Sequence, residues 1–498
     1  MGKRQLLNVL PNFVGLGAGL IFPLIFNIAY YRLLGTEGYG LIGFYGLLVI
    51  VASLVDLRLS QTTLSEVARR APDTDSAGEL HSLVLTFALV SCGLGLLVAC
   101  LTFVLSHWLA ISWLGRSQLS SDEIATAIAI MGGVLALLFP ANIFNAALRG
   151  LQRQTWHNAF AILSGASRGC VTIAALYIFG ATPLVFFSAQ LLLSAIEVIL
   201  LGALVSALLP RSTARLRFDY RLFQTTWRFT LTFWLSGLVG QLILLSDKVV
   251  MSAVLPLDLF GLYSLAFAVA STVHRLSTPF SNSYFPHFVE LVEKRSHDLL
   301  SESYYLSTQL ASAVVICAGL LMFIYANPIM LILTGNAASA EAIGPVFAIL
   351  VAANTLGSLT VLPQMLQLAC GAPWIALRIN FLQAIPYIAL LVPLAPRFGM
   401  YASASLWLAA AVVNFPLLVV MTHRLTLRRQ AWKWFQRVIL APALAAAAVL
   451  VVGAIIVPDP SPLAMLPWFA VNYALALSAA LFCSFRGRLP NFRLKSME

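Results

Sequence analysis

Two eight-residue stretches, EGYGLIGF at residues 37–44 and DLFGLYSL at residues 258–265, are the strongest indication of the fold of this chain. The two stretches are weakly alike, and the shift between them carries Gly40 onto Gly261. Each stretch lies near the start of a long apolar run. A match of this kind indicates that the second part of the chain repeats the first.

Two further pairs of stretches have nearly the same spacing. ALRGLQRQ around Gly150 returns as LACGAPWI around Gly371, after the same interval that separates Gly40 from Gly261. YIFGATPLVFFSAQLL around Gly180 returns as PRFGMYASASLWLA around Gly399, after an interval that is shorter by two positions. All these pairs lie at the boundaries of apolar runs, and the shift covers six runs. The two halves therefore have the same orientation and are related by an axis along the membrane normal.

The composition is that of an integral membrane protein. Of the 498 residues, 60% are hydrophobic and 10% are charged, whereas a soluble domain has about 25% charged residues. The mean hydropathy is +0.90. Apolar runs of about 20 residues, enough for a helix to cross roughly 30 Å of hydrocarbon, recur along the chain. We expect an all-α membrane protein whose first apolar run is retained as a span, because no convincing cleavage site follows it.

The apolar runs predict about fourteen transmembrane helices. Twelve of them are expected to form two parallel six-helix lobes, residues 1–210 and 227–424, joined by a cytoplasmic basic linker at 211–226. Two additional transmembrane helices at 425–485 and a cytoplasmic tail at 486–498 complete the expected organisation. The expected spans are residues 9–33, 39–64, 82–108, 123–149, 157–180, 182–209, 227–254, 259–288, 304–333, 341–369, 375–395, 399–423, 436–457 and 463–485.

The net charge of +11 follows the expected topology and does not indicate a nucleic-acid partner. Basic residues gather in the loops on the side of both termini, whereas the opposite loops hold only Arg32, Arg116 and Arg397. Because basic residues favour cytoplasmic loops, we expect both termini in the cytoplasm. The linker is expected either as an interfacial helix whose arginines contact lipid phosphates or as a solvated loop.

The sequence offers no catalytic or metal-binding motif. The six cysteines are scattered through apolar runs without paired spacing, which predicts neither a disulfide framework nor a zinc site. No P-loop is present, so the sequence does not support ATP hydrolysis. We expect a protein that is not an enzyme and has no cofactor. Any coupling ion is left unidentified by the sequence.

Seven ionisable residues inside the expected spans form the candidate site. Each would cost roughly 2.5–3.5 kcal/mol at the centre of a lipid-facing helix, so we expect them to face one another or a water-filled cavity. They are Asp56, Arg58, Arg168, Glu197, Asp247, Lys248 and Arg275. Amides at similar depth, which suit a sugar-binding chamber or helix-to-helix hydrogen bonds, are Asn142, Asn145, Gln190, Gln241, Asn354, Gln364, Gln367, Gln383 and Asn414.

Three of the seven, Arg168, Glu197 and Arg275, lie near the middle of their expected spans. At 1.5 Å per residue they are about 15–20 Å from either surface. A side chain cannot comfortably extend to the interface over that distance. Arg168 and Arg275 are therefore expected either to line a cavity or to form a buried structural ion pair with Glu197.

The other four lie nearer the ends of their spans. Asp247 and Lys248 are consecutive, so on a helix their side chains point about 100° apart. We expect Asp247 to face the cavity or a basic partner such as Arg275, and Lys248 to reach the interface. Asp56 and Arg58 lie near the inner end of their span, where they could line the cavity or extend to the interface.

The stretch LLGTEGYGLIGFYGLLVIVASLVDLRLSQTTLSEVARR at residues 33–70, its echo SDKVVMSAVLPLDLFGLYSLAF at residues 246–267 and the two parallel halves resemble a known family. It is the polysaccharide-transport (Wzx-like) branch of the multidrug/oligosaccharidyl-lipid/polysaccharide (MOP) exporter superfamily. The resemblance implies two lobes around a V-shaped central cavity. It also implies a flippase of the bacterial inner membrane that moves an undecaprenyl-diphosphate-linked oligosaccharide to the outer leaflet by alternating access, for O-antigen, exopolysaccharide or capsule assembly.

The resemblance also bears on individual residues and partners. Asp56 matches the family's acidic position at the end of the second span, whereas Arg58 departs from the small residue common just after it. Mid-membrane arginines suit the diphosphate of the implied substrate, because they can hold such an anion bidentately. The implied partners are this lipid-linked glycan, membrane lipids and polysaccharide polymerase or export proteins. The last two spans would either form a groove for the lipid tail, as in lipid II flippases, or buttress the second lobe.

Other classes of function remain open on the sequence. A multidrug exporter of the superfamily would favour an acidic cavity, whereas the seven in-span residues are four basic and three acidic. An exporter of the lipid II type would move a related lipid-linked substrate. A polysaccharide polymerase or O-antigen ligase would need a long outer catalytic loop, which the expected topology lacks. A structural scaffold would not explain Arg275 at mid-span.

Overall fold

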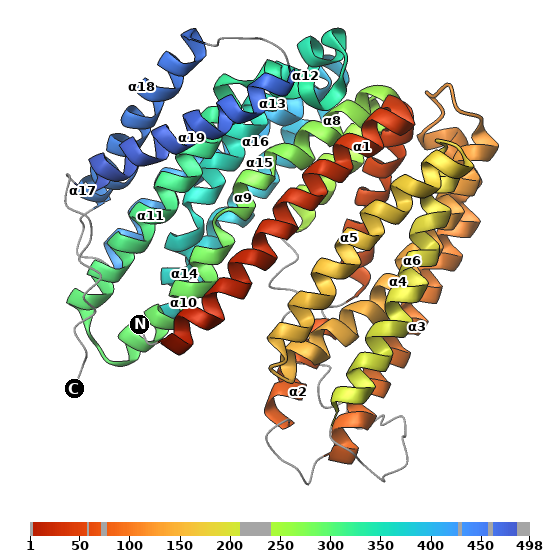
Figure 1. Cartoon of the computed structure of the whole chain (residues 1–498), viewed down its shortest axis with the longest axis horizontal. Helices are drawn as coiled ribbons and strands as arrows, with labels where there is room; N and C mark the ends of the chain where they lie inside the picture. The colour runs from red at the N-terminus through yellow and green to blue at the C-terminus, as the bar shows by residue number, and fades with distance from the viewer. Residues whose placement is uncertain are drawn as a thin grey trace. The chain divides into compact units, whose positions relative to one another are not determined.

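The computed structural model describes residues 3–56, 59–70, 77–209, 241–426, 431–456 and 462–485. Nearly all of these residues are helical, and within these ranges there is no β-strand (Figure 1). The expected all-α fold class is therefore confirmed. The linker at 211–226 and the tail at 486–498 lie outside the described residues.

The helices of the first half follow the expected spans. α1 bends at Gly35, where φ is 71° and ψ is −175°, a conformation that glycine adopts readily. α1 therefore contains the first two expected spans. The second of these was expected to reach residue 64, but α1 ends at Val55 because Asp56 forms a turn before α2. The helices are α1 (Lys3–Val55), α2 (Leu59–Arg70), α3 (Ala77–Trp108), η2 (Leu109–Trp113), α4 (Ser121–Gly150), α5 (Gln154–Phe179) and α6 (Pro183–Leu208), and residues 241–254 are also helical.

Several spans of the second half are interrupted. The span that starts with α8 is broken around Ser271 and again around Ser277, and Thr360 separates two further helices. The helices are α8 (Leu257–Ala270), α9 (Thr272–Arg275), α10 (Thr278–Glu293), α11 (His297–Ile324), α12 (Ala326–Thr334), α13 (Ala337–Leu359), α14 (Val361–Ala369), α15 (Trp374–Phe398), α16 (Met400–Thr426), α17 (Ala431–Trp434), η3 (Phe435–Leu440), α18 (Ala441–Ile455) and α19 (Pro462–Ser484).

Among the described residues, 12 helices are long and apolar enough to cross a membrane. Each of them overlaps an expected span. The part of α1 before Gly35 and the helix at 241–254 lie at the first and seventh expected spans. The arrangement is therefore compatible with the expected count of about fourteen.

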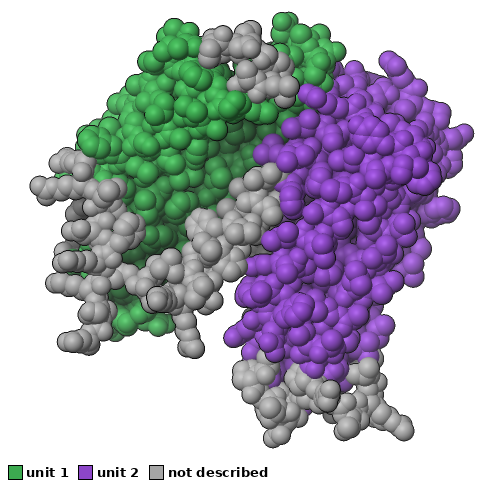
Figure 2. All heavy atoms as spheres, viewed as in Figure 1, with its two compact units in different colours: residues 1–8, 262–498 green, residues 9–261 purple. Residues whose placement is uncertain are grey.

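The chain divides into two compact units (Figure 2). Unit 2 is residues 9–261, and unit 1 consists of residues 1–8 and 262–498. The boundary between the units follows Gly261, inside α8. The division into lobes at 1–210 and 227–424 stays a prediction from the repeat.

In unit 2, α4 packs against α2, α3 and α6. Its buried side chains Ile143 and Leu148 belong to one apolar cluster with Phe87 of α3 and Leu201 of α6. α5 packs against α6. Because lipid is as apolar as these side chains, such contacts stabilise the helices through close packing and interhelical hydrogen bonds.

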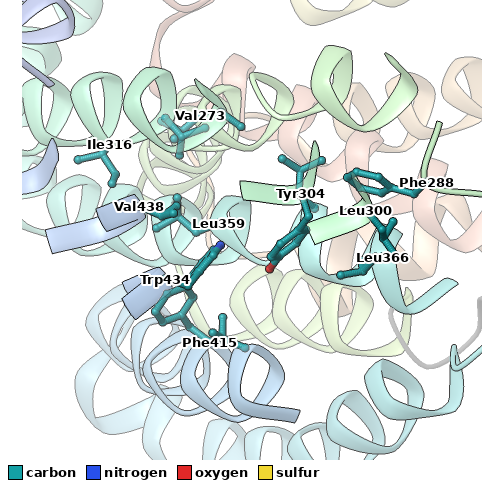
Figure 3. Close-up of a cluster of buried hydrophobic side chains, with 14 of the residues drawn as sticks. Val273, Phe288, Leu300, Tyr304, Ile316, Leu359, Leu366, Phe415, Trp434 and Val438 are labelled. Atoms are coloured by element: carbon teal, nitrogen blue, oxygen red, sulfur yellow. The ribbon is translucent and has the colours of Figure 1, made fainter. Parts of the chain in front are cut away.

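In unit 1, α11 packs against α10, α13, α18 and α19. Its Tyr304 ring lies beside that of Trp434, with centroids 6.2 Å apart and planes inclined by 18° (Figure 3). Trp434 Nε1 also donates to Thr308 Oγ1 of α11 at 3.0 Å. α18 and α19, at the last two expected spans, pack against each other and against α11, which fixes them to this unit.

Candidate functional site

Arg168 on α5 forms an ion pair with Glu197 on α6. The arginine side chain is 31% exposed and the glutamate side chain is 19% exposed. Arg168 Nη1 also donates to Gln190 Oε1 at 2.9 Å and to Ser194 Oγ at 3.1 Å, both on α6. The guanidinium therefore has its charge compensated and several of its donors engaged within unit 2.

The same network continues on both sides of the ion pair. Gln190 Nε2 donates to Thr172 Oγ1 at 3.1 Å, and Ser164 Oγ donates to Glu197 Oε1 at 3.4 Å. Each bond joins α5 to α6, so the two helices share a polar seam along their contact. For Arg168, the geometry is that of the structural ion pair with Glu197, one of the two alternatives that the sequence left open.

Arg275 has a different environment from Arg168. It ends the four-residue helix α9, between α8 and α10, and lies midway along the candidate span Leu257–Glu293. Its side chain is exposed, and among the described residues it has no hydrogen bond or ion pair. Within the described part of the chain, the guanidinium of Arg275 is therefore uncompensated, at the centre of an interrupted span.

The interruption next to Arg275 is tied to a second one. Ser277 Oγ donates to the carbonyl oxygen of Ser358 at 3.2 Å, near the end of α13. Thr360, which separates α13 from α14, donates its backbone N–H to Gly357 O at 3.1 Å. The breaks of two spans therefore lie side by side in unit 1. Interrupted helices of this kind form the binding sites of many membrane transporters.

Asp247 and Lys248 are both buried, with 0% and 8% of their surfaces exposed. Lys248 interacts electrostatically with Asp247, and both side chains interact with other groups. The prediction that Lys248 reaches the interface is therefore wrong. The reason is that the helix at 241–254 turns its lysine into the protein, where the adjacent carboxylate offsets part of the cost of burial.

Asp56 lies in the turn between α1 and α2, just beyond the span that ends at Val55. It is 8% exposed, and its buried Oδ1 atom has no hydrogen-bond partner among the residues that the structure describes. Burial raises the pKa of this carboxyl from 3.8 to about 7. Asp56 is thus buried and does not extend to the interface, while Arg58 lies outside the described residues.

An amide cluster joins α15 to α16 in unit 1. Asn414 Nδ2 donates to Gln383 Oε1 at 2.9 Å and to Asn380 Oδ1 at 3.3 Å. The shift that carries Gly180 onto Gly399 also carries Ser164 onto Gln383. Ser164 and Gln383, which the predicted repeat matches, therefore each take part in a polar contact with the following helix.

Sequence reasoning missed two residues that make polar contacts between separate segments of the chain. Asn380 belongs to the amide cluster, and its position three residues before Gln383, on the same helix face, could have revealed it. Glu37 accepts hydrogen bonds from Ser117 Oγ at 3.0 Å and from the backbone N–H of Gln118 at 2.9 Å. Nothing in the local sequence indicates that this carboxylate caps a distant loop.

Interrupted spans and charged side chains at membrane depth are features that polytopic membrane transporters share. The fold is similar to that of the lipid II flippase MurJ in an inward closed conformation, with a TM-score of 0.69, 12% identity and coverage of 97% of this chain and 98% of that one. It is also similar to an inward-facing multidrug resistance MATE family transporter of the MOP superfamily. There the TM-score is 0.65 with 13% identity, covering 82% of this chain and 95% of that one.

The sequence places the chain within this class. The model of the polysaccharide biosynthesis protein family matches residues 6–292, and the chain belongs to that family. It is 21% identical over 391 residues to a Shigella flexneri protein whose name proposes an O-antigen transporter. The match covers 78% of this chain and 90% of that protein. The expected resemblance to the Wzx-like branch of MOP exporters is confirmed. The names of these relatives are those of transporters and a flippase, not of enzymes.

Proposed function

We propose that this protein is a flippase that moves an undecaprenyl-diphosphate-linked oligosaccharide repeat unit from the inner to the outer leaflet of the bacterial cytoplasmic membrane by alternating access. Its product would feed the assembly of O-antigen, exopolysaccharide or capsule. The family match and the name of the Shigella flexneri relative support a polysaccharide substrate. The likeness to MurJ supports a fold suited to a lipid-linked one.

The observation that carries this proposal is the exposed guanidinium of Arg275 at mid-span, which has no hydrogen bond or ion pair among the described residues. A charge at that depth costs roughly 2.5–3.5 kcal/mol if it faces lipid, so an anionic partner is favoured. The diphosphate of a polyprenyl-linked glycan supplies paired oxygens that a planar guanidinium can hold bidentately. Arg168 differs because Glu197 already neutralises it. We therefore assign recruitment of the diphosphate to Arg275 and give Arg168 a supporting, structural role.

The other candidate functions fit this charge less well. A multidrug exporter carries cations, and Arg275, which has no acidic partner among the described residues, would repel them at mid-span. An exporter of the lipid II type would bind a similar diphosphate, so Arg275 does not separate it from a repeat-unit flippase. The two differ in the glycan, and the lipid-linked intermediate that accumulates in cells lacking the protein identifies which one it moves.

The test is substitution of Arg275 in cells that make the surface polysaccharide. Arg275→Ala should abolish export while the protein stays folded and membrane-inserted, and Arg275→Lys should keep partial export because it retains the charge but loses the planar fork. Arg378→Ala is the matched control. Arg378 lies over the Trp374 ring, 4.7 Å from its centroid, near the start of α15, and its loss should leave export unchanged. Normal export by a well-expressed Arg275→Ala variant would remove Arg275 from the mechanism.

The proposal includes an orientation. We infer from the basic loops that both termini and the linker face the cytoplasm. A cysteine placed at Thr213 should then resist a membrane-impermeant thiol reagent added to whole cells. Strong labelling from outside would reverse the orientation, and with it the direction of transport.

A further inference from the structure

The connection between α4 and α5, inside unit 2, is a tight turn formed by residues 151–153. Gln152 has a φ of 57°, a left-handed conformation that helps the chain to reverse its direction. The backbone N–H of Gln152 donates to Arg149 O at 3.0 Å. After the turn, the backbone N–H of His157 donates to Arg153 O at 3.1 Å. The turn therefore brings the last turn of α4, which holds Arg149, next to the first turn of α5, which holds His157.

Close packing fixes both of these helix ends. Gly150, the last residue of α4, is buried, and a Cβ atom on it would lie 2.8 Å from the Cβ atom of Val67 on α2. Phe160 of α5 packs against the apolar cluster that contains Val67. Phe160 stands three residues after His157, so the two side chains lie on one face of α5. The end of α4 and the start of α5 thus share one packed support.

Two buried nitrogen atoms at this corner make no hydrogen bond. Arg149 Nε and His157 Nδ1 have no hydrogen-bond partner in the part of the chain that the structure describes. The guanidinium of Arg149 acts electrostatically on His157, so the two groups are close together. A buried donor without an acceptor is unfavourable, and most of all when it belongs to a charged group. The two side chains are therefore suited to an acceptor that another molecule supplies.

The acidic side chains of the neighbouring segments are engaged with other arginines. Glu66 of α2, the helix that packs against α4, forms ion pairs with Arg69 and Arg70 of its own helix. Glu79, at the start of α3, lies 3.9 Å from Arg70 Nε. These carboxylates leave Arg149 uncompensated, so the corner between α4 and α5 keeps a positive charge.

The corner lies at the level of the membrane surface. Arg149 stands next to the end of the candidate span Ser121–Gly150, and His157 stands in the first turn of the candidate span Gln154–Phe179. Trp156, beside His157, is exposed, as tryptophans at a membrane interface commonly are. From the distribution of basic residues, this end faces the cytoplasm. The phosphate groups of the lipids in the cytoplasmic leaflet lie at this level, where basic side chains attract them.

We propose that Arg149 and His157 bind the phosphate group of a lipid in the cytoplasmic leaflet. The guanidinium supplies the charge and a fork of N–H donors that fits phosphate oxygens. The imidazole supplies one more donor from α5 when its Nδ1 atom carries the proton. Two kinds of lipid bring this chemistry to the site: an anionic phospholipid and the diphosphate-linked glycan. The second source rests on the proposed function, whereas the site itself does not.

The test is lipid binding by the purified full-length protein in detergent, titrated by native mass spectrometry. The probes are dioleoylphosphatidylglycerol and undecaprenyl diphosphate, and dioleoylglycerol is the control lipid without phosphate. Arg149→Gln should weaken the binding of at least one phosphate probe by about 10- to 150-fold, because it removes a charge-assisted hydrogen bond. His157→Phe should weaken the same probe by about 2- to 10-fold, because it removes a neutral donor. Arg69→Gln is the matched control, since it removes the same charge from an arginine that Glu66 already pairs, and it should leave binding unchanged.

The two probes distinguish the sources of the phosphate. Weakened binding of phosphatidylglycerol alone supports a phospholipid site, and weakened binding of undecaprenyl diphosphate supports a site that receives the proposed substrate. Unchanged binding of both probes to folded, monodisperse Arg149→Gln protein overturns the proposal. An equal loss in Arg69→Gln also overturns it, because the attraction would then be a general effect of surface charge. If Arg149→Gln does not fold, His157→Phe decides the matter by the same criteria.

Thermal unfolding separates lipid binding from a structural role of Arg149. Its side chain has no partner within the described ranges, so the delipidated Arg149→Gln protein should unfold at a midpoint no lower than that of the native protein. Added lipid should raise the midpoint of the native protein more than that of the variant. A lower midpoint for the delipidated variant, with equal shifts on adding lipid, would assign Arg149 to the fold and overturn the site. Neither assay involves transport, so normal export by Arg275→Ala would refute the proposed substrate role of Arg275 and leave this site standing.

Discussion

Breaking the Arg168–Glu197 pair should weaken unit 2 without touching the proposed anion site. Exposed ion pairs contribute about 0.2–1 kcal/mol, and loss of one partner from a buried pair costs about 3–5 kcal/mol. With 31% and 19% of the side chains exposed, this pair lies between those cases. Arg168 would also keep Gln190 and Ser194 as neutral acceptors in a Glu197→Ala variant. We expect that variant to lose about 2 kcal/mol of stability.

Arg168→Ala should cost at least as much. Glu197 would retain only the long 3.4 Å bond from Ser164, and a partly buried carboxylate with one weak donor is poorly compensated. The double variant should be no less stable than the worse single variant, with a coupling energy of about 1 kcal/mol or more, because removing both charges leaves neither uncompensated.

The assay is thermal unfolding of the purified protein, followed by the fluorescence of its 10 tryptophans. A loss of about 2 kcal/mol corresponds to a fall in the midpoint of roughly 4 °C or more for a unit of this size. Arg275→Ala is the contrasting variant. Since Arg275 has no partner among the described residues, its removal should change stability by less than about 0.5 kcal/mol. Additive effects of the two pair substitutions would refute the ion-pair account.

Two further predictions concern the other buried charges. Because the pKa of Asp56 is raised to about 7 in the folded protein from 3.8, the folded state binds this proton more tightly, so its contribution to stability is full below about pH 4 and is lost as the pH rises through about 7. The unfolding midpoint of the native protein relative to Asp56→Asn should therefore fall between pH 4 and 7, and parallel curves would contradict the assignment. Asp247→Asn and Lys248→Gln should each lower the amount of folded protein in membranes, since each leaves the other charge buried, and the double variant should recover part of the loss. If the double variant is less abundant than either single variant, the contacts of Asp247 and Lys248 with other groups stabilise the protein more than their attraction to each other does.

The elements that sequence reasoning predicted well are those with a local signal. The length of an apolar run determines whether it can cross a membrane, so the positions of the spans followed from the sequence alone. The repeat inferred from the matched glycines stays a prediction; Gly40 and Gly261 both lie where an added Cβ atom would overlap backbone atoms. The early end of α1 was missed because the polar turn at Asp56 is followed by further helix with a mixed composition.

What sequence reasoning could not supply is the pairing of side chains between helices. Arg168 and Arg275 are alike by depth, and their different roles depend on the neighbouring helix: α6 brings Glu197 to the first, and no described residue brings an acid to the second. The burial of Lys248 likewise depends on how its helix is rotated. Glu37 reads as a solvated loop residue until the fold brings the Ser117–Leu119 loop to it.

The polar seam between α5 and α6 has a consequence for how the protein is made. On its own, α5 would bring an unpaired arginine into the bilayer, at a cost of roughly 2.5–3.5 kcal/mol on insertion scales. Only residues 180–182 separate the end of α5 from the start of α6, so the two helices can leave the translocon as one hairpin with Arg168 already bound to Glu197. α15 and α16, whose seam consists of neutral amides, carry no such penalty and can insert one after the other. In an insertion reporter, α5 alone should therefore enter the membrane less often than the α5–α6 hairpin, and equal insertion would show that the ion pair forms only after biogenesis.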